Sequence, residues 1–197
     1  QMPTQTEVHT WAQAGIAYRR ADSDAPANRF RLYEVAGMPH NNARDLPFFF
    51  TDPCTLPITD FPAGSFTGLG LNYLIEWIAA GTPPPHAPYI EVDQDPSNDG
   101  SYLRLDEFGN ARGGIRNVWV DVPIATYGVF GVGKTPAMDR LCLLIGTEVP
   151  LPTDTLSELY SNRGQYVERV NRRLMELIRE GWFLHEYADQ VRDDLKL

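Results

Sequence analysis

The sequence predicts an α/β fold in which two sheet strands are followed by an appended region of helices and short strands. Two β-strand patterns stand near the start of the chain, at residues 2–8 and 29–37, separated by a weaker helical pattern at residues 10–21. A helical apolar pattern follows at residues 70–81, and the last third of the chain is helical in pattern. An apolar content of 43% is enough for a packed core.

The first two strand patterns define the sheet region, residues 1–50. The stretch "MPTQTEV" is a short strand candidate, and "RFRLYEVAG" alternates like a buried strand that ends at Gly37. The apolar residues of this second strand are Phe30, Leu32, Tyr33, Val35 and Ala36. We expect residues 51–197 to form an appended helix, short-strand and C-terminal helical region that packs on this sheet.

The appended region begins with a helix at "GLNYLIEWIAAG". Gly81 is its predicted C-cap, and the three prolines that follow prevent its continuation. Short strands are expected at "PYIEV" and "SYLRL", a tight turn at "DEFGNARGG" and an extended segment at "NVWVDVPIATY". The helix carries one apolar stripe that must pack against something, made of Leu71, Leu74, Ile75 and Ile78.

A long amphipathic helix is predicted in the last third of the chain. Its apolar residues keep a spacing of three to four, and Gly181 ends it. These residues are Val167, Val170, Leu174, Leu177 and Ile178. A final short helix is expected at "EYADQVRDDL", residues 186–195.

Composition excludes several classes of function. With 17 basic and 26 acidic residues, the net charge is −9, which argues against a nucleic-acid partner. No run of about 20 apolar residues is present, so no membrane span is expected. The two cysteines, Cys54 and Cys142, allow one disulfide or two buried thiols. The sequence does not determine the cellular compartment, and a secreted or periplasmic location is one alternative.

The stretch "GVFGVGKT", residues 128–135, fits the phosphate-binding pattern G-x-x-x-x-G-K-[ST]. A working phosphate loop needs a long helix that starts at the lysine, and here Pro136 and a short, broken segment follow. The alternating strand–helix units of a nucleotide-binding fold are also missing. We therefore interpret this stretch as a glycine-rich surface loop.

His40 follows the second strand directly, in "RLYEVAGMPH". Open α/β sheets place their chemistry at the carboxyl ends of the strands, and a histidine held there becomes a general base when a carboxylate orients it. Glu7 is the favoured carboxylate, because it lies at the end of the preceding strand candidate. Asp22 and Asp24 are the alternatives, although "DSDAPAN" is typical of a turn.

The remaining polar candidates are assigned structural roles. His9 and His86 have no carboxylate or histidine at ligand spacing, and "HEYAD", residues 185–189, lacks the second histidine of a zinc motif. Asp121 needs a partner if it is buried, and Arg116 or Arg112 can supply one. "PFFF", residues 47–50, is interpreted as core, with an acyl pocket or lid as the alternative. We expect no cofactor and no metal.

Several segments, taken in order, resemble the C-terminal part of the bacterial alpha/beta hydrolase domain-containing proteins. They are "RADSDAPANRFRLYEVAGMPH", "APYIEV", "LDEFGNARGGIR", "VWVDVPIATY" and the closing "LYSNRGQYVERV…GWF". The resemblance covers nearly the whole chain. It implies the C-terminal portion of an esterase-like α/β-hydrolase with a Ser-His-acid triad, in which His40 is the histidine and Glu7 the acid.

The nucleophile of such a triad is missing from this sequence. No G-x-S-x-G occurs, and neither Ser65 nor Ser101 follows a buried strand that turns into a helix. The resemblance implies that the serine belongs to an N-terminal portion of the hydrolase preceding Gln1, which would be this chain's partner in acting on a small-molecule ester. This chain alone is then expected to be inactive. The alternative is a non-catalytic association module that pairs with a separate chain.

Overall fold

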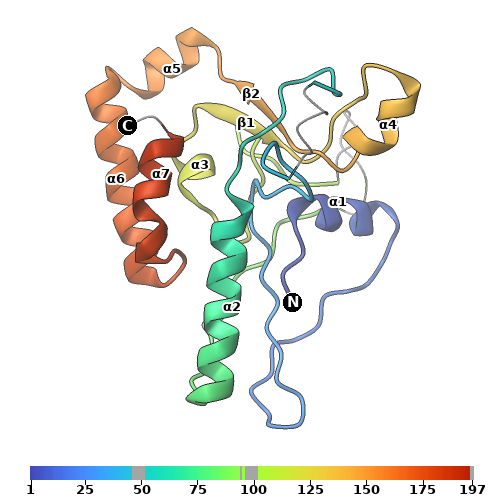
Figure 1. Cartoon of the computed structure of the whole chain (residues 1–197), viewed down its shortest axis with the longest axis vertical. Helices are drawn as coiled ribbons and strands as arrows, with labels where there is room; N and C mark the ends of the chain where they lie inside the picture. The colour runs from blue at the N-terminus through green and yellow to red at the C-terminus, as the bar shows by residue number, and fades with distance from the viewer. Residues whose placement is uncertain (46–51, 94, 96–101, 196–197) are drawn as a thin grey trace.

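The computed structural model describes residues 1–45, 52–93, 95 and 102–195. Its helices are α1 (Gln5–Gln13), α2 (Ala63–Ala79), α3 (Val118–Asp121), α4 (Pro136–Cys142), α5 (Thr153–Leu159), α6 (Arg163–Glu180) and α7 (Ala188–Asp194), with the 3-10 helix η1 (His185–Tyr187) before α7. Its strands, β1 (Ala125–Gly128) and β2 (Thr147–Pro150), pair antiparallel. Figure 1 shows α5, α6 and α7 on one side of the molecule, α1 and α4 on the other, and the two strands between them.

The α/β character lies in three extended segments that run parallel. Thr4 forms a parallel bridge with Val35, and Val35 forms another with Ile115. The amine of Gln1 donates to the Arg31 carbonyl at 2.8 Å, which extends the first pairing to the start of the chain. The two predicted sheet strands therefore lie side by side, but as isolated bridges and not as continuous strands.

The strand predicted at residues 2–8 is wrong beyond Thr4, because a helix starts there. Thr4 and Glu7 form a capping box, in which the Glu7 carboxylate accepts a hydrogen bond from the Thr4 backbone N–H at 2.7 Å. This motif supplies partners for helix N–H groups and so favours α1 over a continued strand. The helical pattern at residues 10–21 is also shortened, since α1 ends at Gln13 and Gly15 has a φ of 64°.

The short strands of the middle region appear as paired bridges. Ile90 pairs with Gly113, Val92 with Leu103 and Leu105 with Ala111. The turn predicted at residues 106–114 is confirmed: the Asp106 carboxylate accepts from the N–H groups of Phe108 and Asn110, and Gly109 has a φ of 77°. The glycine is needed there because that φ is costly for any residue with a Cβ.

The extended segment predicted at residues 117–127 is only partly correct. The Asn117 side chain accepts from the Trp119 N–H at 3.1 Å and caps the short helix α3, so only Ala125–Gly128 is a strand. An N-terminal asparagine cap outweighs the β preference of the valine and tryptophan that follow it. The partner strand β2 falls in a stretch for which the sequence predicted no strand.

The loop of residues 128–135 is not arranged to hold a phosphate. The N–H of Gly131 donates to the Cys142 carbonyl at 2.8 Å, and the N–H of Gly133 donates to Asp139 at 3.0 Å. Lys134 pairs with Asp52. The N–H groups of both glycines and the lysine side chain are therefore already engaged, and the helix that follows, α4, has only seven residues.

The buried apolar side chains of the described residues form one large cluster and a second, small one around Cys54, Cys142 and Ile145. The large cluster joins three helices, since it includes Leu174 of α6, Trp119 of α3 and Phe66 of α2. Cys54 and Cys142 form a disulfide, which resolves the two possibilities left by the sequence. None of the described helices combines the length and apolarity that crossing a membrane requires. The "PFFF" stretch, residues 47–50, lies outside the described residues, which resume at Asp52.

Candidate active site

The structure brings the two predicted site residues together. Nδ1 of His40 is hydrogen-bonded to Oε1 of Glu7, across 33 positions of sequence. The Glu7 side chain is 22% exposed and that of His40 46% exposed, so the pair lies at the surface with its carboxylate more protected. A carboxylate on Nδ1 favours the tautomer that leaves Nε2 as a proton acceptor.

Glu7 is held at both of its oxygens. Oε1 contacts His40, while Oε2 accepts hydrogen bonds from the backbone N–H and the hydroxyl of Thr4. Because Glu7 is the third residue of α1, its negative charge also lies where the helix dipole is favourable to it. The capping box therefore orients the carboxylate as well as starting the helix.

The backbone of His40 is tied to the same helix by Thr6. The His40 N–H donates to the Thr6 hydroxyl at 3.1 Å, and that buried hydroxyl donates to the carbonyl of Val129 at 2.8 Å. Upstream, Gly37 turns the chain with a φ of 80°, and a Cβ there would lie 3.1 Å from Val120. A tight turn packed against the core thus directs the histidine towards α1.

His40 and Glu7 open into a hollow of about 890 Å³, here called the histidine hollow. Its walls come from the start of the chain, from the segment around Met38 and Asp45, and from the first half of α2. Apolar side chains, including Met2, Trp11 and Leu71, make up much of these walls. A hollow of this size, with one His-carboxylate pair among apolar walls, suits a small organic molecule.

The histidine hollow holds no serine among the described residues that line it. Ser65 is 4% exposed in α2, and its hydroxyl is 3.5 Å from Gln190. Ser101 lies outside the described residues. Within the described part of the chain, the hollow therefore has a candidate base and its orienting acid without the serine that the sequence analysis sought.

The alternative acids, Asp22 and Asp24, are engaged elsewhere. Asp24 pairs with Arg31 at 2.7 Å, and Asp22 contacts Nδ1 of His86 at 2.6 Å. Of the three carboxylates considered, Glu7 is the one at His40.

The His86–Asp22 pair was missed by the sequence analysis because its members are 64 positions apart. The roles of Thr4 and Thr6 were also missed. The pattern Thr4-x-x-Glu7 is a capping-box signature and could have revealed the role of Thr4. No local signal marks Thr6, since its partners come from residues 40 and 129.

The other polar residues have structural surroundings. Asp121 pairs with Arg116 at 2.6 Å, one of the two partners considered, and also with Arg173 of α6 at 2.7 Å. His9 is 6% exposed and lies 5.0 Å, centroid to centroid, from the ring of Phe130. Among the described residues, no group of three or more potential ligands could hold a metal ion.

A family model described as an alpha/beta hydrolase domain matches residues 1–193. The match spans nearly all of the chain, including both residues of the His-carboxylate pair. No curated protein matches, and no solved structure does.

Proposed function

The chain belongs to the alpha/beta hydrolase domain family, and we propose that it is the C-terminal part of a serine hydrolase acting on carboxylic esters. Hydrolase-type function follows from the family. The proposal adds the ester substrate, the general base His40, the orienting acid Glu7 and a serine supplied by a portion of the protein that precedes Gln1.

The observation that carries this proposal is the contact between His40 Nδ1 and Glu7. With the carboxylate on Nδ1, Nε2 can take the proton of a serine hydroxyl while the serine oxygen bonds to the ester carbonyl carbon. The tetrahedral intermediate then expels the alcohol, which leaves with the proton from His40. Water repeats the sequence on the acyl-enzyme and releases the carboxylic acid and the free serine.

Two features support a serine from elsewhere. Residues 1–4 pair with residues 31–35 on one side, and no bridge occupies their other side within the described chain. An edge strand presents unpaired N–H and C=O groups, so this edge offers a place for a further parallel strand. Ile75 and Ile78 of α2, which are exposed and line no part of the histidine hollow, offer a second surface for the same portion of the protein.

The test is substitution of His40 in the complete protein. We expect His40→Ala to lower kcat/KM for a p-nitrophenyl ester by about 10³-fold or more, while the melting temperature stays near that of the parent. Glu7→Gln should lower kcat/KM by about 10²–10⁴-fold, because the neutral amide no longer stabilises the imidazolium of His40.

His86→Ala is the matched control. His86 is also exposed and also has a carboxylate on Nδ1, but it lies outside the histidine hollow. Its removal should leave turnover unchanged. Normal turnover by His40→Ala, or an equal loss in both histidine variants, would refute the assigned role.

The alternative proposal, a non-catalytic association module, rests on the exposed stripe of α2. Leu71, Leu74, Ile75 and Ile78 are 50–71% exposed, a large apolar face for a free surface. A module would form a discrete complex with a separate chain and would show no ester turnover in any form of the protein. Analytical ultracentrifugation with an ester assay on the same sample distinguishes the two proposals.

A further inference from the structure

We propose that a second pocket, formed by α2 and residues 29–33, binds an apolar carboxylate. Here it is called the arginine pocket. We infer that it receives the non-reacting end of the ester, so that the substrate class is an ester with an apolar body and a carboxylate at its far end. This assignment of the substrate rests on the proposed function, whereas binding of the carboxylate does not.

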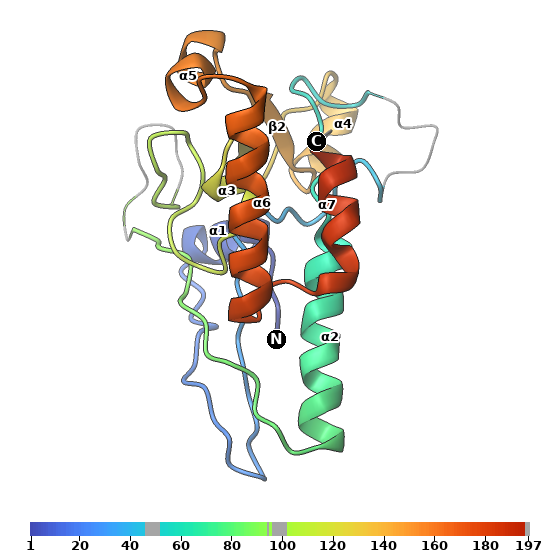
Figure 2. The same ribbon diagram turned by 90° about the vertical axis from the view of Figure 1, so that its left-hand side faces the viewer.

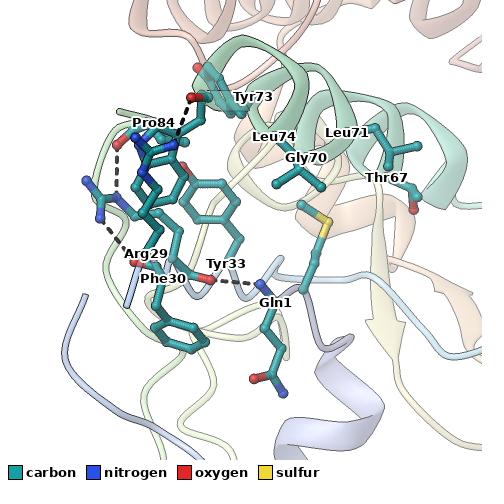
Figure 3. Close-up of a pocket in the computed structure, with 13 residues that line it drawn as sticks. Gln1, Arg29, Phe30, Tyr33, Thr67, Gly70, Leu71, Tyr73, Leu74 and Pro84 are labelled. Atoms are coloured by element: carbon teal, nitrogen blue, oxygen red, sulfur yellow. Dashed lines mark hydrogen bonds between the residues drawn. The ribbon is translucent and has the colours of Figure 1, made fainter. Parts of the chain in front are cut away.

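The arginine pocket has a volume of about 350 Å³ and mainly apolar walls. Trp77 is 6% exposed and Tyr33 4% exposed, so these two rings form fixed surfaces. Leu74 and Met2 add flexible apolar side chains. Figure 3 shows Phe30, Tyr33 and Pro84 on one side of the pocket and Leu71 and Thr67 on the other. Aromatic walls of this kind suit a ring or an alkyl chain.

Two arginines line the pocket, and they differ in their partners. The Arg31 side chain is 5% exposed, and its charge is already paired: it forms an ion pair with Asp24 at 2.7 Å. It also donates a hydrogen bond to the Pro84 carbonyl at 2.9 Å. Arg29 is exposed and donates to the Trp77 carbonyl at 3.3 Å, and within the described chain it pairs with no carboxylate. Its guanidinium therefore keeps donors and a positive charge available beside an apolar wall. That combination favours an organic anion over a neutral or cationic ligand.

The arginine pocket adjoins the histidine hollow. Both cavities are lined by Gln1, Met2, Thr67 and Leu71. A molecule that spans this shared wall can place one end at Arg29 and its ester group at His40. Contacts far from the reacting bond position it, so such an arrangement contributes to rate as well as to binding.

The binding test uses this chain directly, by isothermal titration calorimetry with 2-naphthoate and with 2-naphthalenemethanol. The two ligands share a ring system and differ in charge. We expect the naphthoate to bind more tightly than the alcohol by roughly fivefold, the scale of a partly exposed ion pair, with the difference falling as salt is added. Absence of naphthoate binding, or equal affinity for both ligands, would overturn the inference.

Three variants locate the site. Arg29→Gln should remove the preference for naphthoate and leave the alcohol unaffected. Leu74→Asp should weaken both ligands, because it places a carboxylate in the apolar wall. Ile78→Asp is the matched control, since Ile78 is 71% exposed one turn further along the same helix and does not line the pocket. Equal effects of the Leu74 and Ile78 variants would contradict the assigned site.

The link to the reaction is tested in the complete protein, with aryl esters that end in a carboxylate or in a methyl group. Arg29→Gln should raise KM for the carboxylate ester by about fivefold and leave kcat and the methyl ester unchanged. If naphthoate binds but His40→Ala retains full turnover, the proposed function fails and the pocket stands. If His40→Ala abolishes turnover while Arg29→Gln has no effect on either assay, the pocket assignment fails and the proposed function stands.

Discussion

Two long helices of this molecule show the same apolar periodicity in the sequence and opposite behaviour in the structure. In α6, the predicted stripe faces the core: Val170, Leu174 and Leu177 are at most 1% exposed. Its other two members, Val167 and Ile178, are partly buried. In α2, the predicted stripe is exposed, and a different face is buried through Phe66, Leu69 and Trp77. The sequence predicted that the α2 stripe packs against something; none of the described residues covers it, so its cover stays a prediction.

The difference comes from what each helix carries on its other face. The other face of α6 is charged, so only one side of the helix can enter a core. α2 is apolar on more than one side, and such helices are typically covered all round in a complete structure. Figure 2 shows α2 extending away from the C-terminal helices, towards the same end of the molecule as the loop of residues 20–30. The apolar periodicity of the sequence therefore identified the stripe on α2, but not the surface that packs against it.

The largest difference between the two helices should appear on truncation of one buried and one exposed leucine. Leu174→Ala should lower the free energy of unfolding by about 2–5 kcal/mol, through lost apolar burial and a cavity in the core. Leu74→Ala, at a site that is 50% exposed, should change it by less than about 0.5 kcal/mol. Urea denaturation of the two variants gives both values. Similar losses at the two sites would mean that α2 is covered in this chain as well.

The glycines that end the two helices provide the next comparison. Gly81 after α2 has a φ of 73° and Gly181 after α6 has a φ of 84°, so alanine at either costs about 1 kcal/mol. A Cβ at Gly81 meets nothing within 4 Å, whereas one at Gly181 would lie 2.5 Å from the Tyr73 hydroxyl.

That hydroxyl donates to the Gly181 carbonyl and joins α2 to the end of α6. Gly181→Ala should therefore be the more destabilising of the two substitutions, as measured by thermal denaturation. The excess should disappear in a Tyr73→Phe background. An equal loss at both glycines would show that the contact between the helices is unimportant.

Tyr160, which lies between α5 and α6, should make the folded chain less stable at alkaline pH. Burial raises the pKa of Tyr160 to about 12, although Arg169, whose guanidinium lies 5.5 Å from the ring centroid, opposes the shift. Because the unfolded tyrosine ionises near pH 10, its contribution is complete below pH 10 and is lost as the pH rises towards 12. The urea midpoint should fall over this range, and more steeply in the parent than in Tyr160→Phe. Parallel curves would contradict this assignment.

The smallest effect is expected on the outer face of α2. Ile75→Lys, at a position that is 62% exposed, should leave the unfolding free energy of this chain within about 0.5 kcal/mol of the parent. In the complete protein the same substitution should be destabilising, because a covering segment would bury the lysine charge. An equal change in melting temperature in this chain and in the complete protein would indicate that nothing covers α2 and that its outer face is a free surface.

The sequence singled out two residues that lie in contact, although it predicted the wrong secondary structure for one of them. His40 was placed by a strand ending in glycine, and Glu7 by its position in the preceding segment; the structure puts them in contact. Glu7 nevertheless stands on a helix and not at a strand end. The two side chains meet because the first turn of α1 and the residues that follow the second extended segment lie at the same end of the parallel segments.

What the sequence determined by itself is local: the capping box, the glycines at helix ends, the tight turn at Asp106 and the amphipathic face of α6. Each is specified by residues within a few positions of one another. Tertiary structure alone decided which face of α2 is buried, the Cys54–Cys142 pairing and the partners of Asp22, Thr6 and Asp121. Those contacts join distant segments, and their free energy depends on burial that no short stretch of sequence contains.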